Sequence, residues 1–133
     1  MVDLDFLPRF ALPITSGVKT STIRRDPPAL RPGAQMRLVT GLGTPACRLL
    51  LRVPCWSATR ISIRRDGLFL GAQFHTGQHA HRIAQADGFT CLREMVEWFE
   101  ARYPNTPLSG FIRIAWRFED ALEVLPTARA RAA

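Results

Sequence analysis

Lysine is almost absent from this chain. It occurs once, as Lys19, whereas the other seventeen of the eighteen basic residues are arginines. A guanidinium stays protonated in proteins, but a lysine amine that is removed from water can lose its proton and act as a base. Lys19 is therefore a candidate for chemistry that arginine cannot perform. The alternative is that it survived by chance in an arginine-rich sequence.

Disulfide partners and long apolar runs are also missing. The three cysteines, Cys47, Cys55 and Cys91, are odd in number and not closely paired, which indicates reduced, mostly buried thiols. No run approaches the roughly 18 apolar residues of a membrane-spanning helix. The N-terminal MVDLDFLPRF carries acids where a signal peptide would be basic. We therefore expect a cytoplasmic protein without membrane contact.

Negative charge is in short supply, with eleven acidic residues and a net charge of +7. This balance makes anionic partners plausible, nucleic acid first, although a general arginine bias would produce the same charge. A chain of 133 residues, 47% hydrophobic, suffices for one domain with its own core. The composition favours an RNA ligand and leaves the oligomeric state open, a monomer included.

Period-two alternation recurs along the chain and predicts half-buried strands. Four segments place apolar residues on one face and arginines on the other: QMRLVT at 35–40, CRLLLRV at 47–53, ATRISIRR at 58–65 and FIRIAWRF at 111–118. KTSTIRR, which follows Val18, is rich in β-branched residues and suits a further strand. RDG at 65–67 indicates a hairpin.

Helices are expected in three places. FLPRFALPITSG predicts a short, proline-interrupted helix that ends at Gly17, and HAHRIAQAD predicts a second. A third begins where Thr90 can cap it and continues to Tyr103. We expect a single α+β domain over residues 1–120, a small and mainly antiparallel barrel or curved sheet with two or three helices, and a disordered tail over 121–133.

Three histidines lie close in sequence, at 75, 79 and 81, and three imidazoles can form an open zinc site. However, Gly77 interrupts the region, and no helix places residues 79 and 81 on one face. No carboxylate or cysteine at ligand spacing completes a motif. The sequence therefore predicts no metal and no cofactor.

The segment ADGF at 86–89 lies just before the third expected helix. Asp87 precedes a glycine and an aromatic residue, so its carboxylate could point from a loop into a site. An ordinary turn aspartate would fit the same pattern. Both interpretations stay open.

Taken together, GVKTSTIRR, RPGAQMRLV, ADGF and FIRIAWRF resemble the ASCH domain, a branch of the PUA-like superfamily. The shared pattern is a helix, G-x-K-T-x-T-I-R, a P-G turn into a strand, an acidic-Gly-Phe segment, a helix and a closing apolar strand. It covers roughly residues 6 to 118. The resemblance implies a PUA-like β-barrel of about five or six mostly antiparallel strands with two or three flanking helices.

Small ASCH proteins include hydrolases that deacetylate N4-acetylcytidine with a lysine, a threonine and a carboxylate. The resemblance implies Lys19 as the base, Thr22 as the nucleophile and Asp87 as the acid, which stands where those hydrolases carry glutamate. The same motif supplies three substrate-binding candidates: Thr20, Arg24 and Arg25.

Strict strand alternation places Lys19 and Thr22 on opposite faces. Their convergence therefore requires a bulge or turn near Ser21. Thr20 is the fallback hydroxyl, although it has the same facing problem.

Three functions stay open. We favour a small hydrolase that cleaves the amide of an N4-acylated cytidine or a related acylated nucleoside. The alternative is an RNA- or nucleotide-binding module, ribonuclease activity included, in which Trp56 or Phe74 stacks on a base. Its phosphates would be held by two arginine faces, Arg48/Arg52 and Arg60/Arg64. The third is a structural Lys19–Asp87 ion pair on a protein whose arginines are only a solvated surface.

Overall fold

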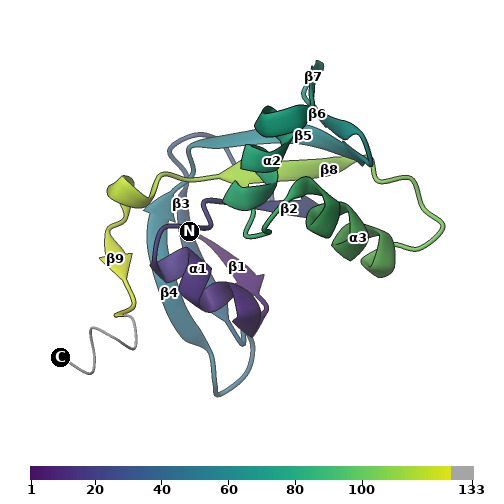
Figure 1. The fold of residues 1–133 in the computed structure, drawn as a ribbon. Coiled ribbons are helices and arrows are strands. Elements are labelled where there is room, and N and C mark those ends of the chain that lie inside the picture. Colours follow the sequence, from purple (N-terminus) through teal and green to yellow (C-terminus); the bar gives the residue numbers. More distant parts are fainter. Residues whose placement is uncertain (127–133) are drawn as a thin grey trace.

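The computed structural model describes residues 1–126, and residues 127–133 lie outside the described part. Two sheets and three α-helices make up the fold, which confirms the α+β class (Figure 1). The two sheets do not close into a barrel within residues 1–126. No helix in this range is long and apolar enough to cross a membrane.

The first sheet has four strands, and its order in space is β1-β3-β4-β9. These strands are β1 (Val2–Phe6), β3 (Gln35–Thr40), β4 (Arg48–Pro54) and β9 (Glu123–Val124). β1 runs parallel to β3, and the other pairs are antiparallel. β1 was not predicted, although VDLDF alternates and places Leu4 and Phe6 in the core. Its alternating pattern covers only five residues and is followed closely by prolines, so it is a weak strand signal.

The second sheet has five antiparallel strands in the order β2-β8-β5-β6-β7. They are β2 (Ser21–Arg25), β8 (Phe111–Ala115), β5 (Ser57–Arg64), β6 (Gly67–Leu70) and β7 (Gln73–His75). β8 is an interior strand. Phe111, Ile114 and Ala115 are buried and Arg113 is half-buried, so the expected outward face of arginines is wrong for this strand.

Three α-helices lie in the predicted places: α1 (Ala11–Thr15), α2 (Gly77–Ala86) and α3 (Leu92–Arg102). Two 3-10 turns accompany them, η1 (Pro8–Phe10) and η2 (Phe118–Asp120). Cys91 rather than Thr90 is the N-cap of α3; the Thr90 N–H and hydroxyl instead donate to the Glu94 carboxylate at 3.2 and 3.0 Å. α2 and α3 pack against each other beside the second sheet (Figure 1).

β4 also departs from the expected alternation. In the pairing of β3 with β4, Leu38 faces Leu51 and Val39 faces Leu49, so Leu50 is an extra residue in the ladder. Such a bulge reverses the faces of the residues that precede it. Leu50 is consequently buried and Cys47 is exposed, which corrects the expectation that Cys47 lies on an apolar face.

The expected tail begins with ordered residues. Glu123–Val124 forms β9 and pairs with Leu51 and Arg52 of β4, so the expected disorder does not apply to residues 121–126. The rest of the tail, 127–133, lies outside the described residues.

The feature that positions the site is the meeting of two sheet edges. β1 and β2 are each the outermost strand of their sheet. The Arg24 guanidinium on β2 donates from Nη2 to the backbone carbonyl of Asp5 on β1. Because an edge strand leaves backbone groups without a strand partner, this side chain joins the two sheets where no strand pairing does.

Candidate active site

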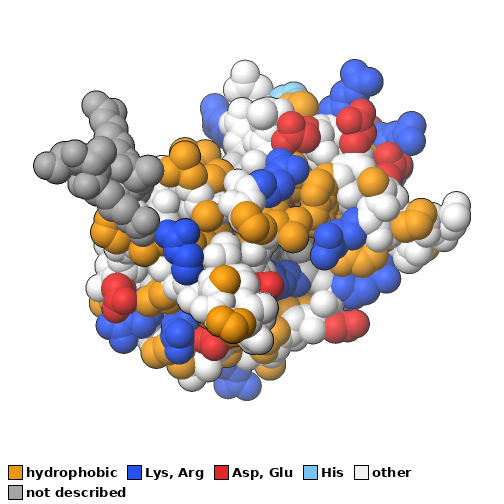
Figure 2. Space-filling view, turned by 90° about the horizontal axis from the view of Figure 1, so that it is seen from below, with side chains coloured by type: hydrophobic (Ala, Val, Ile, Leu, Met, Phe, Trp, Pro, Cys, Tyr) orange, Lys and Arg blue, Asp and Glu red, His pale blue; other side chains and the backbone are white. Residues whose placement is uncertain are grey.

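A cavity of about 240 Å³ lies between β1, β2, the segment after α2, and α3. Its walls are mainly aromatic, formed by Phe6, Phe10, Phe89, Trp98, Phe99 and Tyr103. The charged and hydroxyl side chains that line it are Asp5, Lys19, Thr22, Arg24, Arg25, Asp87 and Arg102. Figure 2 shows a face on which Lys and Arg side chains are spread among hydrophobic ones. The cavity thus brings together every proposed site residue except Thr20, which does not line it.

Backbone hydrogen bonds place Lys19 beside Asp87. The Lys19 N–H donates to the Pro13 carbonyl at 2.8 Å, and the Thr20 N–H donates to the Ala86 carbonyl at 2.7 Å. These bonds fix the segment before β2 against α1 and against the last residue of α2. Asp87 is the next residue along the chain, so the two side chains meet although 68 positions separate them.

The ADGF segment ends α2 in a Schellman motif. The Gly88 N–H donates to the Gln85 carbonyl and the Phe89 N–H to the Ala84 carbonyl, both at 3.0 Å, and Gly88 has a φ of +97°. Asp87 is the C-cap. A carboxylate is unfavourable at the negative end of a helix dipole, so helix capping alone does not account for Asp87.

Lys19 and Asp87 form a buried charge pair. Lys19 Nζ lies 3.5 Å from Asp87 Oδ1, and the two side chains are 3% and 4% exposed. Lys19 Nζ also donates to the Asp87 backbone carbonyl and lies 4.6 Å from the centre of the Phe10 ring. The amine therefore faces an aromatic ring and a carboxylate, with almost no water.

Burial moves the two pKa values toward each other. Loss of water lowers the pKa of Lys19, and the positive charges of Arg24 and Arg113 lower it further, against the opposing charge of Asp87. Loss of water also raises the pKa of Asp87, against the opposing effects of Lys19 and Arg113. Both shifts favour a neutral amine beside a protonated acid, which is the arrangement that a base and an acid catalyst require.

Two polar neighbours of Asp87 were not predicted. Ser21 Oγ donates to Asp87 Oδ1 at 3.2 Å, and Ser21 is fully buried. Its position two residues after Lys19 could have revealed it, because alternate residues of an extended segment share a face. Arg113 affects the pKa values of both Lys19 and Asp87, and its buried Nε has no hydrogen-bond partner within the described residues.

Thr22 reaches the cavity without a bulge. β2 pairs with β8 in unbroken register from Ser21 to Arg25, so the strand contains no bulge. The regular pleat instead begins at Ser21, directly after Lys19 and Thr20. Lys19 therefore lies outside the strand, and its side chain lines the cavity and contacts Asp87. Thr22 Oγ1 accepts a hydrogen bond from Arg24 Nε at 3.3 Å.

Substitution of Gly88 by alanine is expected to destabilise the protein by about 2 kcal/mol and to displace Lys19. A Cβ at residue 88 would lie 3.1 Å from Lys19 Cδ and 3.1 Å from Phe10 Cδ1, and the φ of +97° adds backbone strain. Gly33→Ala is the matched control, because Gly33 has a φ of +93° and nothing within 4 Å of its Cβ position. Urea unfolding measures the free energy of unfolding of both variants. Equal losses of stability would show that the space between Gly88 and Lys19 can accommodate a methyl group.

The other predicted features lie apart from the cavity. Trp56 is 53% exposed, with the Arg117 guanidinium 3.9 Å from its ring centre. Phe74 contacts Phe69 at a ring separation of 4.7 Å. His81 Nδ1 accepts a hydrogen bond from the Leu92 N–H at 3.1 Å. Among residues 1–126, no three histidine, cysteine, aspartate or glutamate side chains are grouped to hold a metal ion.

Comparisons with protein-family models, with curated proteins and with solved structures give no match for this chain. A proposal for its function therefore rests on the chemistry of the cavity.

Proposed function

We propose that the protein is a small amidohydrolase of the ASCH type, acting on an N4-acylated cytidine or a related acylated nucleoside. The observation that carries this proposal is the buried contact of Lys19 with Asp87 in a cavity that the Thr22 hydroxyl also lines. Amide hydrolysis through a covalent intermediate needs a nucleophile, a base and an acid. These three side chains supply one of each.

In the proposed first half-reaction, neutral Lys19 takes the proton of the Thr22 hydroxyl, and Oγ1 attacks the acyl carbon. The bond from that carbon to the exocyclic nitrogen breaks, and protonated Asp87 gives its proton to the leaving amine. Arg24, whose Nε donates to Thr22 Oγ1, stabilises negative charge on that oxygen. Cytidine leaves, and Thr22 carries the acyl group.

In the second half-reaction, water attacks the acyl-threonine and Asp87 accepts its proton. The bond from the acyl carbon to Thr22 Oγ1 breaks, and Lys19 returns its proton to that oxygen. A carboxylic acid leaves, and both catalytic groups regain their starting protonation states.

The walls of the cavity suit a flat, aromatic substrate. Phe10, Phe89 and Trp98 contact one another, with ring centres 5.8, 6.1 and 6.5 Å apart, and such faces stack on nucleobases. A volume of about 240 Å³ is below the usual range for drug-sized ligands. We therefore expect the cavity to take a single base with a short acyl group, with the sugar at the opening.

The test is incubation of the purified protein with N4-acetylcytidine, followed by chromatography for cytidine. We expect cytidine and acetate in equal amounts. Mass spectrometry of the acid-quenched protein is expected to find the acetyl group on Thr22. An acetyl group on Thr20 would instead make the fallback hydroxyl the nucleophile.

A binding module without chemistry is the second candidate. It is favoured by the hydrogen bonds that Lys19 and Thr22 already make, because Lys19 donates to the Asp87 backbone carbonyl and Thr22 is bonded to Arg24 rather than to Lys19. In that case we expect a calorimetric titration to detect binding of cytidine, and chromatography to find N4-acetylcytidine unchanged after incubation with the protein.

A further inference from the structure

Three arginines gather at the cavity although they come from two distant segments. Arg24 and Arg25 lie at the end of β2, and Arg102 lies in the last turn of α3; all three line the same cavity. Burial lowers the pKa of Arg24 most, and the nearby charge of Arg102 lowers it further, against the opposing charges of Asp5 and Asp87. Bringing like charges together costs free energy, so a fold that does so without a role for the charges is disfavoured.

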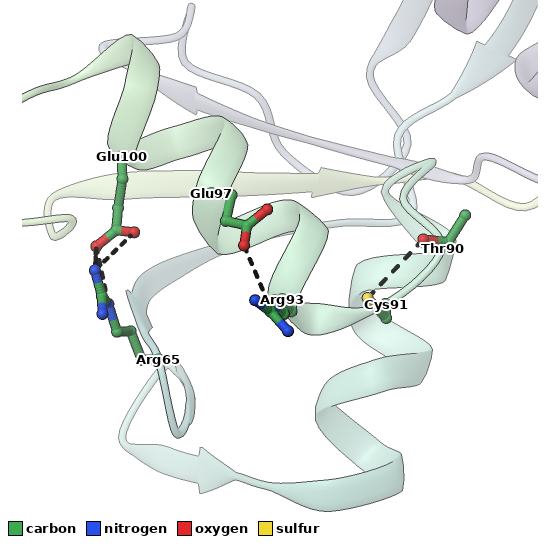
Figure 3. A network of polar contacts seen from close by, with 6 residues as sticks. All are labelled: Arg65, Thr90, Cys91, Arg93, Glu97 and Glu100. Carbon is green, nitrogen blue, oxygen red and sulfur yellow. Dashed lines mark hydrogen bonds and ion pairs between the residues drawn. The ribbon is translucent and has the colours of Figure 1, made fainter.

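Acidic partners for these arginines are scarce. Within residues 1–126, no carboxylate lies within ion-pair distance of Arg24, Arg25 or Arg102. Some arginines elsewhere on the surface do have acidic partners. Figure 3 shows Arg93 bound to Glu97 and Arg65 bound to Glu100 on the outer side of α3, with closest atoms 3.1 and 3.2 Å apart.

Aromatic rings hold the guanidinium groups by their faces. The Arg25 guanidinium carbon lies 4.8 Å from the ring centre of Tyr103 and 4.9 Å from that of Phe111. The corresponding distance from Arg102 to Trp98 is 5.1 Å. A guanidinium donates hydrogen bonds in its own plane. Stacking therefore orients these two groups while leaving their donors available at the opening of the cavity.

We infer that Arg25 and Arg102 form a phosphate-binding site at the opening of the cavity, so that the ligand is a nucleotide rather than a free nucleoside. Planar guanidinium groups match phosphate oxygens in two-point hydrogen bonds. The inference rests on the proposed function only in taking the ligand to be a cytidine derivative. Two sources share this chemistry: a free nucleotide with a phosphate monoester, and an RNA strand with phosphodiesters.

The test compares cytidine with cytidine 5′-monophosphate by calorimetric titration of the full chain at about 0.05 M ionic strength, where charge contacts are weakly screened. We expect the monophosphate to bind at least about tenfold more tightly, since hydrogen bonds in which both groups are charged are stronger than those between neutral groups. The advantage is expected to fall to about twofold or less in the double variant Arg25→Gln/Arg102→Gln.

Arg93→Gln is the matched control, because it removes one arginine charge from α3 at a position paired with Glu97 and outside the cavity. We expect it to retain the advantage of the monophosphate. The inference is overturned by equal affinities for cytidine and its monophosphate, by an advantage that survives the double variant, or by binding of neither ligand.

A third titration with a pentacytidylate separates the two sources of phosphate. Tighter binding of the monophosphate assigns the site to a free nucleotide, and tighter binding of the oligonucleotide assigns it to RNA. Hydrolysis is a separate readout. Turnover of N4-acetylcytidine without any preference for phosphate overturns only this inference, whereas tight monophosphate binding without turnover overturns only the proposed hydrolase.

Discussion

Replacing Lys19 by methionine is expected to lower kcat/KM for N4-acetylcytidine by about a thousandfold, because a positioned general base contributes about 10²–10⁴ in rate. Methionine has an unbranched, apolar side chain of similar length, so it preserves the packing against Phe10 while removing the amine. Binding of cytidine, measured by calorimetry, is expected to survive.

Lys19→Arg separates the charge of the residue from its basicity. The guanidinium retains the positive charge beside Asp87 but stays protonated, so it cannot take a proton from Thr22. We expect the same loss of activity as in the methionine variant. Substantial turnover by a folded Lys19→Arg protein would show that Lys19 acts through its charge. Basicity would then not explain why this position is a lysine in an arginine-rich chain.

The dependence of kcat/KM on pH is a further readout of this role. Activity requires Lys19 to be neutral and Asp87 to be protonated, so kcat/KM is expected to rise with pH and then to fall again, as a bell-shaped profile. Burial favours both neutral forms, because it lowers the pKa of Lys19 and raises that of Asp87. In Asp87→Asn no acid remains to lose a proton, so the residual activity is expected to rise with pH without the subsequent fall.

The two halves of the buried pair are expected to give opposite dependences of stability on pH. In Lys19→Met, the pKa of Asp87 lies above its ordinary 3.8 because burial acts without the opposing ammonium. Between 3.8 and that raised pKa the folded state binds more protons than the unfolded state. The free energy of unfolding therefore falls as pH rises, by up to about 1.4 kcal/mol per pH unit.

In Asp87→Asn, the pKa of Lys19 lies below its ordinary 10.5 because burial acts without the carboxylate. Between that lowered pKa and 10.5 the unfolded state binds more protons. The free energy of unfolding therefore rises with pH, with a limiting slope of the same size and opposite sign.

Urea unfolding at a series of pH values, with the wild-type curve subtracted, measures both slopes. Parallel curves for the two variants would contradict the burial of this pair. The double variant Lys19→Met/Asp87→Asn serves as the control, because it leaves no uncompensated charge. Its loss of stability is expected to be smaller than the sum of the single losses, which are about 3 kcal/mol or more each where the remaining charge is ionised.

Local pattern predicted most of the secondary structure. The helix from Leu92 to Arg102 and the strands at 35–40 and 57–64 are recognisable from apolar spacing, because each buries one face. The predicted faces of the strands were wrong where the pairing between strands, rather than the local sequence pattern, determines which side chains are buried. The extra residue Leu50 in β4 is visible only against its partner strand, and β8 is covered on both faces because it lies between β2 and β5.

The amino-acid sequence by itself determined the unusual status of Lys19 and the candidacy of Asp87, because a residue count and a helix-ending Asp-Gly are local properties. Only the tertiary structure decided that they meet, through the bond from the Thr20 N–H to the Ala86 carbonyl and the contact of Ser21 with Asp87. The cavity arises only where the outer strands of two sheets face each other beside α3. Side chains from all of these segments together bury Lys19 and Asp87, and this burial shifts their pKa values. No single stretch of the sequence contains these side chains.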